Sequence, residues 1–165
     1  MGESRASRVA ARFTVASRPV TPLHPIFVHF PIALLVTAAA IDLAMLGVNP
    51  KATLRSVSTG LYLVGSVALI VTYVTGRSDA EEFRIPGMAH SVLDEHWTSA
   101  LRTTVFFNVF AVVRFVLEWS ERLVSRLRWL PVIVAGMVGL LFLVQTAERG
   151  GQLVYDYGVG VAVPR

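Results

Sequence analysis

Four long apolar segments constrain this chain more than any other feature of its sequence. They cover residues 26–47, 58–75, 92–117 and 129–147. A hydrocarbon core about 30 Å thick is crossed by roughly 20 helical residues, and a spanning segment must satisfy its backbone hydrogen bonds internally. The segments have about this length, and they lack the alternation of barrel strands. The sequence therefore predicts an all-α protein, a four-helix transmembrane bundle.

The composition agrees with a membrane protein and excludes several other classes. Hydrophobic residues make up 54% of the 165 residues and charged residues 16%, whereas a soluble domain carries roughly 25% charged residues. The absence of Cys excludes disulfides, thiolate metal sites and c-type haem attachment. The basic residues form no patch between aromatics, and no phosphate loop or hydrolase triad is evident. We therefore expect neither nucleic-acid binding nor a stand-alone catalyst.

Three regions follow from the patterning along the chain. Residues 1–20 are expected to form a mobile basic tail, and residues 21–149 the four-span membrane domain. Residues 150–165 combine many glycines with β-formers and tyrosines. We expect this last region to be ordered but not helical, lying at the membrane surface or against a partner.

Prolines, glycines and caps predict the helix ends. The first helix is expected to begin at Pro25, because a start at Pro31, the other proline suited to a first helical position, leaves too short a span. Ser91 resembles an N-cap, which predicts a third helix from about Val92. The glycine pair at 150–151 is expected to end the fourth helix.

The loops predict how the protein is oriented. An even number of spans places both chain ends and the loop 76–95 on one side, here called the His side because it holds all four histidines. The short loops of the opposite side, 48–57 and 118–128, carry five basic and two acidic residues. Basic residues in short loops mark the cytoplasmic side, which favours an external His side. Four arginines before the first span favour the opposite orientation, with the His side in the cytoplasm.

The histidines are the best candidates for binding a cofactor. His24 and His29 lie at the entrance of the first span, and His90 and His96 at that of the third. Since both helices enter from the same side, His29 and His96 are expected at similar depth. Two imidazoles from neighbouring helices of a bundle can hold a flat macrocycle as axial ligands of its iron. We predict a b-type haem whose iron is bound by His29 and His96, with His24 and His90 as further cofactor contacts.

Two other interpretations of these histidines remain open. Interfacial His and Trp often only anchor a helix at headgroup level. Alternatively, imidazole with carboxylate suits zinc, copper or non-haem iron, and such a site would use His24, His90, Asp94 and His96.

Three charged residues fall inside the predicted spans. Arg102 lies one to two turns into the third span, where an unpaired guanidinium is costly, so a haem propionate, Glu95 or Asp156 is expected beside it. Asp42 and Arg114 lie near the exits of the first and third spans. Because a lone charge there costs about 3 kcal/mol, we expect them to form an ion pair.

Several motifs together resemble a known family. They are the opening stretch 23–34 (LHPIFVHFPIAL), Thr75-Gly76 with Asp79, His96 and the closing stretch 150–161 (GGQLVYDYGVGV). The sequence resembles a family of predicted four-span bacterial membrane proteins of unknown function, which implies a multi-pass protein of the bacterial inner membrane. Some members resemble anchors acting beside Rieske-type iron–sulfur domains, which implies a redox setting.

Two functions compete on this basis. The first is electron transfer in the membrane by a haem b protein, beside a larger redox complex. The second is an accessory structural subunit of a respiratory or photosynthetic membrane complex, with no redox cofactor of its own. A solute carrier is disfavoured, because the middle of the spans offers few polar groups for a binding site.

Overall fold

Four long helices form the bundle that the apolar segments predict. The computed structural model describes residues 23–47, 52–82, 85–120 and 126–161, so the tail expected at 1–20 lies outside the described residues. All four helices are long and apolar enough to cross a membrane, which confirms the predicted fold class. The elements are α2 (His24–Gly47), α3 (Ala52–Glu82), the short 3-10 helix η1 (Gly87–Ala89), α4 (His90–Trp119) and α5 (Arg126–Tyr155).

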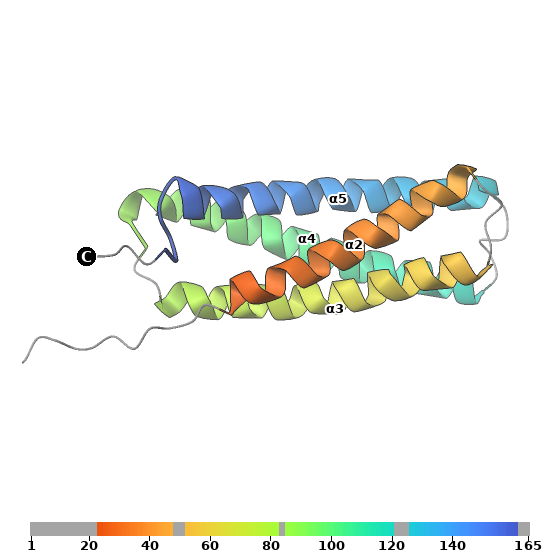
Figure 1. Cartoon of the computed structure of the whole chain (residues 1–165), viewed down its shortest axis with the longest axis horizontal. Helices are drawn as coiled ribbons and strands as arrows, with labels where there is room; N and C mark the ends of the chain where they lie inside the picture. The colour runs from red at the N-terminus through yellow and green to blue at the C-terminus, as the bar shows by residue number, and fades with distance from the viewer. Residues whose placement is uncertain (1–22, 48–51, 83–84, 121–125, 162–165) are drawn as a thin grey trace, which may run out of the picture.

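The bundle consists of two antiparallel helix pairs, α2 with α3 and α4 with α5 (Figure 1). Helix α2 crosses the bundle obliquely, and its first turn is held against the last turns of α3. The two described chain ends lie at the same end of the bundle, the His side.

The interior of the bundle is a narrow apolar core. Leu35, Tyr62, Phe107 and Ile133 are almost completely buried. No more than 39% of the apolar window of each helix is buried inside the protein, so most of the apolar surface faces outward. A large exposed apolar surface marks contact with a membrane or partner, and here it surrounds all four helices.

Helices α2 and α4 begin within two residues of the starts that the sequence predicts, whereas α3 begins at Ala52, six residues before the expected start. Helix α2 begins at His24, one residue before Pro25, and Pro31 lies inside it. Helix α4 begins at His90 because η1 leads directly into it, and its N-cap is Ala89 rather than Ser91. The N-cap prediction at Ser91 is therefore wrong.

The predicted end of the fourth helix is also wrong, because α5 continues through the glycine pair at 150–151 to Tyr155. Glycine costs about 1 kcal/mol in a helix, but Leu153 is buried against Ala89 and Leu93. This packing holds the last turns of α5 in helical form. The ordered non-helical tail expected over 150–165 is limited, in the described residues, to those after Tyr155.

The turn that ends α5 depends on a single glycine. Gly158 has a φ of 66°, a left-handed conformation that glycine adopts without steric cost and that commonly ends helices. The N–H of Val159 then donates to the carbonyl oxygen of Leu153 over 2.9 Å. The closing stretch is thereby folded back onto the His side of the bundle.

Candidate cofactor site

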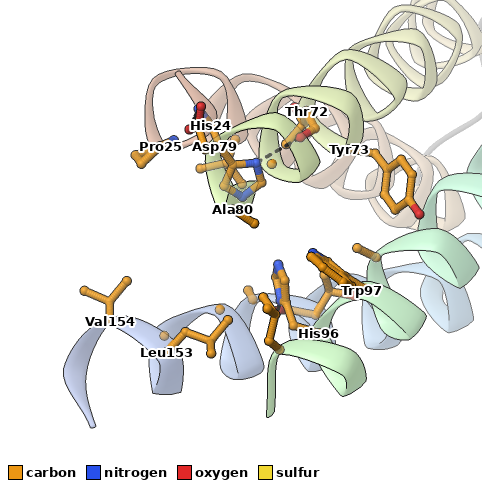
Figure 2. Close-up of a pocket in the computed structure, with 18 of the residues that line it drawn as sticks. His24, Pro25, Thr72, Tyr73, Asp79, Ala80, His96, Trp97, Leu153 and Val154 are labelled. Atoms are coloured by element: carbon orange, nitrogen blue, oxygen red, sulfur yellow. Dashed lines mark hydrogen bonds between the residues drawn. The ribbon is translucent and has the colours of Figure 1, made fainter. Parts of the chain in front are cut away.

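Two histidines face each other between the helix pairs on the His side (Figure 2). His24 is the first residue of α2, and His96 lies two turns into α4. The centroids of their rings are 6.3 Å apart, and the ring planes are nearly perpendicular at 87°. Because the two helices belong to different pairs, the imidazoles lie on opposite walls of the space between them.

Both imidazoles are held through the same ring atom. His24 Nδ1 lies 2.9 Å from the carbonyl oxygen of Thr72 on α3. His96 Nδ1 lies 3.1 Å from that of Thr146 on α5. A carbonyl oxygen only accepts, so Nδ1 carries the proton and Nε2 of the neutral ring keeps a free lone pair. The same arrangement orients histidines that ligate metals through Nε2.

Two glycines make room for these rings. A Cβ atom on Gly76 of α3 would lie 2.8 Å from His24 Nδ1, and one on Gly150 of α5 would lie 3.1 Å from His96 Cε1. Any larger residue would push the imidazole away from its position. The close approach of ring to backbone accounts for a glycine inside each of these helices.

Asp79 completes the attachment of α2 to α3. Its Oδ2 accepts a hydrogen bond of 2.8 Å from the backbone N–H of His24. The first N–H groups of a helix lack partners within the helix and favour negative charge nearby. The backbone and the ring of His24 are therefore both bound to α3, and the motif residues Gly76 and Asp79 act on this one histidine.

The two rings line a cavity of about 510 Å³. Small-molecule sites are about 300–1,000 Å³ and mostly apolar, and this cavity has a similar volume and lining. Its walls come from all four helices and the segment after α5, and they include Leu69, Leu93, Trp97, Leu143 and Leu153.

The separation of the two rings is about equal to that of two imidazoles bound to one metal ion whose remaining ligands come from another group. A histidine nitrogen binds zinc at about 2.0–2.1 Å, so two rings facing each other across one ion have centroids about 6 Å apart. The rings of His24 and His96 have this separation. Within the described part of the chain, no group of three or more His, Cys, Asp or Glu side chains could hold a metal ion. Two protein ligands suffice when a porphyrin supplies the others.

His29 does not face His96 in the structure. It is exposed, and its Nδ1 lies 2.9 Å from the carbonyl oxygen of Pro25 in its own helix. Five residues correspond to about 140° around a helix, so His24 and His29 point in different directions. Docking of the first turn of α2 on α3 directs His24 toward the second helix pair and leaves His29 at the edge of the cavity.

The remaining predicted site residues lie outside the cavity. His90 is exposed at the start of α4, and the described residues do not form the alternative metal site with Asp94. Arg102 is exposed, donates to Gln145 Oε1 over 2.6 Å and lies 4.5 Å from the ring centroid of Phe142. The expected partner Glu95 instead pairs with Arg149 at 3.2 Å.

Several residues that shape the site escaped the sequence analysis. Thr72 and Thr146 act through backbone carbonyls, which leave no signal in a sequence. Gly76 and Asp79 stood in the motifs and could have been found as partners of a helix start. Arg77 lines the cavity but was assigned to a loop, because the second span was expected to end near residue 75.

A second polar cluster joins the helices at the opposite side of the bundle. Arg114 Nη1 and Nη2 donate to the carboxylate of Asp42 at 2.6 and 2.9 Å, and both side chains are completely buried. Arg114 Nε donates to Thr59 Oγ1 over 2.8 Å, and Ser58 Oγ donates to Asp42 Oδ1 over 2.7 Å. The predicted ion pair is confirmed.

Aromatic rings complete this cluster. The guanidinium carbon of Arg114 lies 4.8 Å from the ring centroid of Tyr62 and 4.4 Å from that of Trp129. Asp42, Tyr62, Arg114 and Trp129 come from α2, α3, α4 and α5. The cluster thus connects all four helices at the side opposite the cavity.

Four apolar helices with a histidine-lined cavity at one end define a multi-pass membrane protein with a candidate cofactor site. Over residues 20–163 the chain matches the family described as Predicted membrane protein (DUF2231), and it belongs to this family. Membership in a family of predicted membrane proteins, expected from the motifs, is confirmed. No curated protein and no solved structure matches the chain.

Proposed function

We propose that the protein binds one b-type haem through His24 and His96 and transfers electrons in the membrane. The observation that carries this proposal is the facing pair of imidazoles, each with Nδ1 bound to a backbone carbonyl. The proposed ligands come from the first and third spans, the two spans that the sequence analysis named for this role. His24 takes the place that the sequence analysis assigned to His29.

The residues around the cavity have separate parts in this proposal. His24 and His96 bind from opposite walls, while Gly76 and Gly150 allow the rings their positions. A bound haem supplies a one-electron couple whose potential depends on its axial ligands. His24 and His96 would hold this group from both sides, and a group held by two histidines would supply electron transfer rather than catalysis at the iron.

The location of the site suggests where a redox partner binds. Both histidines lie within the first two turns of their helices, so the proposed haem is near one membrane surface. We propose that this surface faces the outside of a bacterial inner membrane, because the short loops of the opposite side are rich in basic residues. A redox protein or larger redox complex would approach from the His side.

Absorption spectroscopy of the purified full chain tests the proposal. Protein made in haem-replete membranes is expected to show a Soret band and a low-spin spectrum typical of two axial histidines. His24→Ala and His96→Ala should each lose the low-spin signal, and added imidazole should restore it if the variant is folded. His29→Ala and His90→Ala are matched controls that should keep the wild-type spectrum.

Two results would refute the proposal. Wild-type protein that is colourless and takes up no added haem would exclude haem binding and favour the accessory structural subunit, which should then migrate on native gels with defined partners. A low-spin spectrum that survives His24→Ala but is lost in His29→Ala would assign the ligand to His29.

A further inference from the structure

We infer that Arg77 binds an anionic group of the ligand in this cavity, a carboxylate such as a haem propionate. The inference rests on the proposed function, because it names Arg77 as the residue that binds the carboxylates of the proposed haem.

Arg77 lines the cavity, and neighbouring residues connect it to both histidines. On α3 it follows Gly76, whose backbone contacts the ring of His24. Its guanidinium carbon lies 4.4 Å from the ring centroid of Trp97, which follows His96 on α4. Arg77 therefore reaches from one helix pair to the other, and both it and Trp97 line the cavity.

The charge of Arg77 has no carboxylate partner among the described residues. Asp79 accepts from the backbone of His24, and Glu95 pairs with Arg149. The ring of Trp97 is the contact that the structure gives Arg77. A guanidinium stacked on a ring keeps its in-plane N–H groups free, and their geometry suits bidentate binding of a carboxylate.

The rest of the cavity indicates what kind of ligand would use this cation. The walls are mainly apolar, and the imidazoles of His24 and His96 face each other across the space. An apolar body with an anionic edge complements this arrangement, and a haem with its propionates is such a ligand. The phosphate of an anionic lipid shares the chemistry of that edge, so the two sources have to be separated by experiment.

Arg102 offers a matched control. Like Arg77 it is exposed and lies over an aromatic ring, with 4.5 Å between its guanidinium carbon and the ring centroid of Phe142. It is not among the residues that line the cavity. Substitution of either residue removes one positive charge from the same half of the bundle, so a general electrostatic effect would appear in both variants.

Titration of the full-length apoprotein with haem and with haem dimethyl ester, in uncharged detergent, tests the inference. The esters remove the carboxylate charges and leave the iron ligation unchanged. The measured quantity is the ratio of the affinity for haem to the affinity for the ester. This ratio should be at least about threefold higher in wild type and in Arg102→Gln than in Arg77→Gln, as expected for the loss of a charge-assisted hydrogen bond at a partly exposed site. Because each ligand partitions into detergent to the same extent with every variant, comparing this ratio between variants cancels the effect of the detergent.

The outcomes separate this inference from the proposed function. If wild type and Arg77→Gln prefer haem over the ester equally, the inference is overturned while haem binding stands. The same holds if Arg77→Gln and Arg102→Gln lose this preference equally. Failure of wild type to bind either ligand refutes the proposed function, and the inference with it. If anionic lipid weakens haem binding in wild type but not in Arg77→Gln, the anion site is supported and lipid phosphate competes for it.

Discussion

Removing one partner of the buried Asp42–Arg114 pair should destabilise the bundle more than any exposed substitution. In Asp42→Asn, the guanidinium of Arg114 stays buried with Thr59 and two aromatic rings but without its counter-charge. Asn is nearly isosteric with Asp, so the change removes charge with little loss of packing.

The expected size of the effect follows from burial and geometry. Both side chains are completely buried, and two hydrogen bonds of 2.6 and 2.9 Å join them. Breaking a buried pair on one side costs about 3–5 kcal/mol, whereas replacing both partners is often close to neutral.

The assay is reversible unfolding of the full chain in mixed micelles, followed by far-ultraviolet circular dichroism. Asp42→Asn should lower the free energy of unfolding by about 3 kcal/mol or more, and the double variant with Arg114→Met should recover at least about 2 kcal/mol. Arg149→Gln is the control, since it breaks the exposed pair with Glu95 and should cost less than about 1 kcal/mol.

Two results would contradict this reasoning. If Asp42→Asn costs no more than Arg149→Gln, the buried charge is compensated by something other than its ion pair. If the double variant is as unstable as the sum of its single variants, the two residues are not energetically coupled.

Two glycines provide further tests, with Gly60→Ala as the common control because a Cβ there has no atom within 4 Å. Gly76→Ala places a Cβ 2.8 Å from His24 Nδ1, so the imidazole must move away from the carbonyl oxygen of Thr72. We expect the affinity for haem, measured by titration, to fall about tenfold. An unchanged affinity would contradict the role of Gly76. Gly139→Ala places a Cβ 2.5 and 2.7 Å from the rings of Phe106 and Phe107. Its free energy of unfolding should fall by about 1–3 kcal/mol, and a stability equal to that of Gly60→Ala would show that the rings move aside freely.

The ion pair could be predicted from sequence because its cause is local. Asp42 and Arg114 each lie in an apolar segment near the same membrane surface, and the cost of an isolated charge in lipid requires a partner whatever the details of packing. Its additional contacts could not be predicted, because Thr59 and Trp129 reach the guanidinium only after all four helices have packed.

The histidine pair shows where such reasoning ends. Depth in the membrane can be counted along a helix, and by that measure His29 was a suitable partner for His96. Which side of α2 faces the second helix pair depends on contacts with Thr72, Gly76 and Asp79. The end of α5 is similar, because burial of Leu153 outweighs the weak helix propensity of the glycine pair.

The amino-acid sequence alone determined the number of spans, the side on which the histidines gather and the pairing of the intramembrane charges. These properties follow from hydropathy and from the energy of charges in lipid, which act on each segment separately. Only the tertiary structure decided which imidazoles face each other, that a cavity lies between them and that Arg77 lines its edge. The rotation and tilt of each helix are set by side chains from several helices at once, and no single segment contains that information.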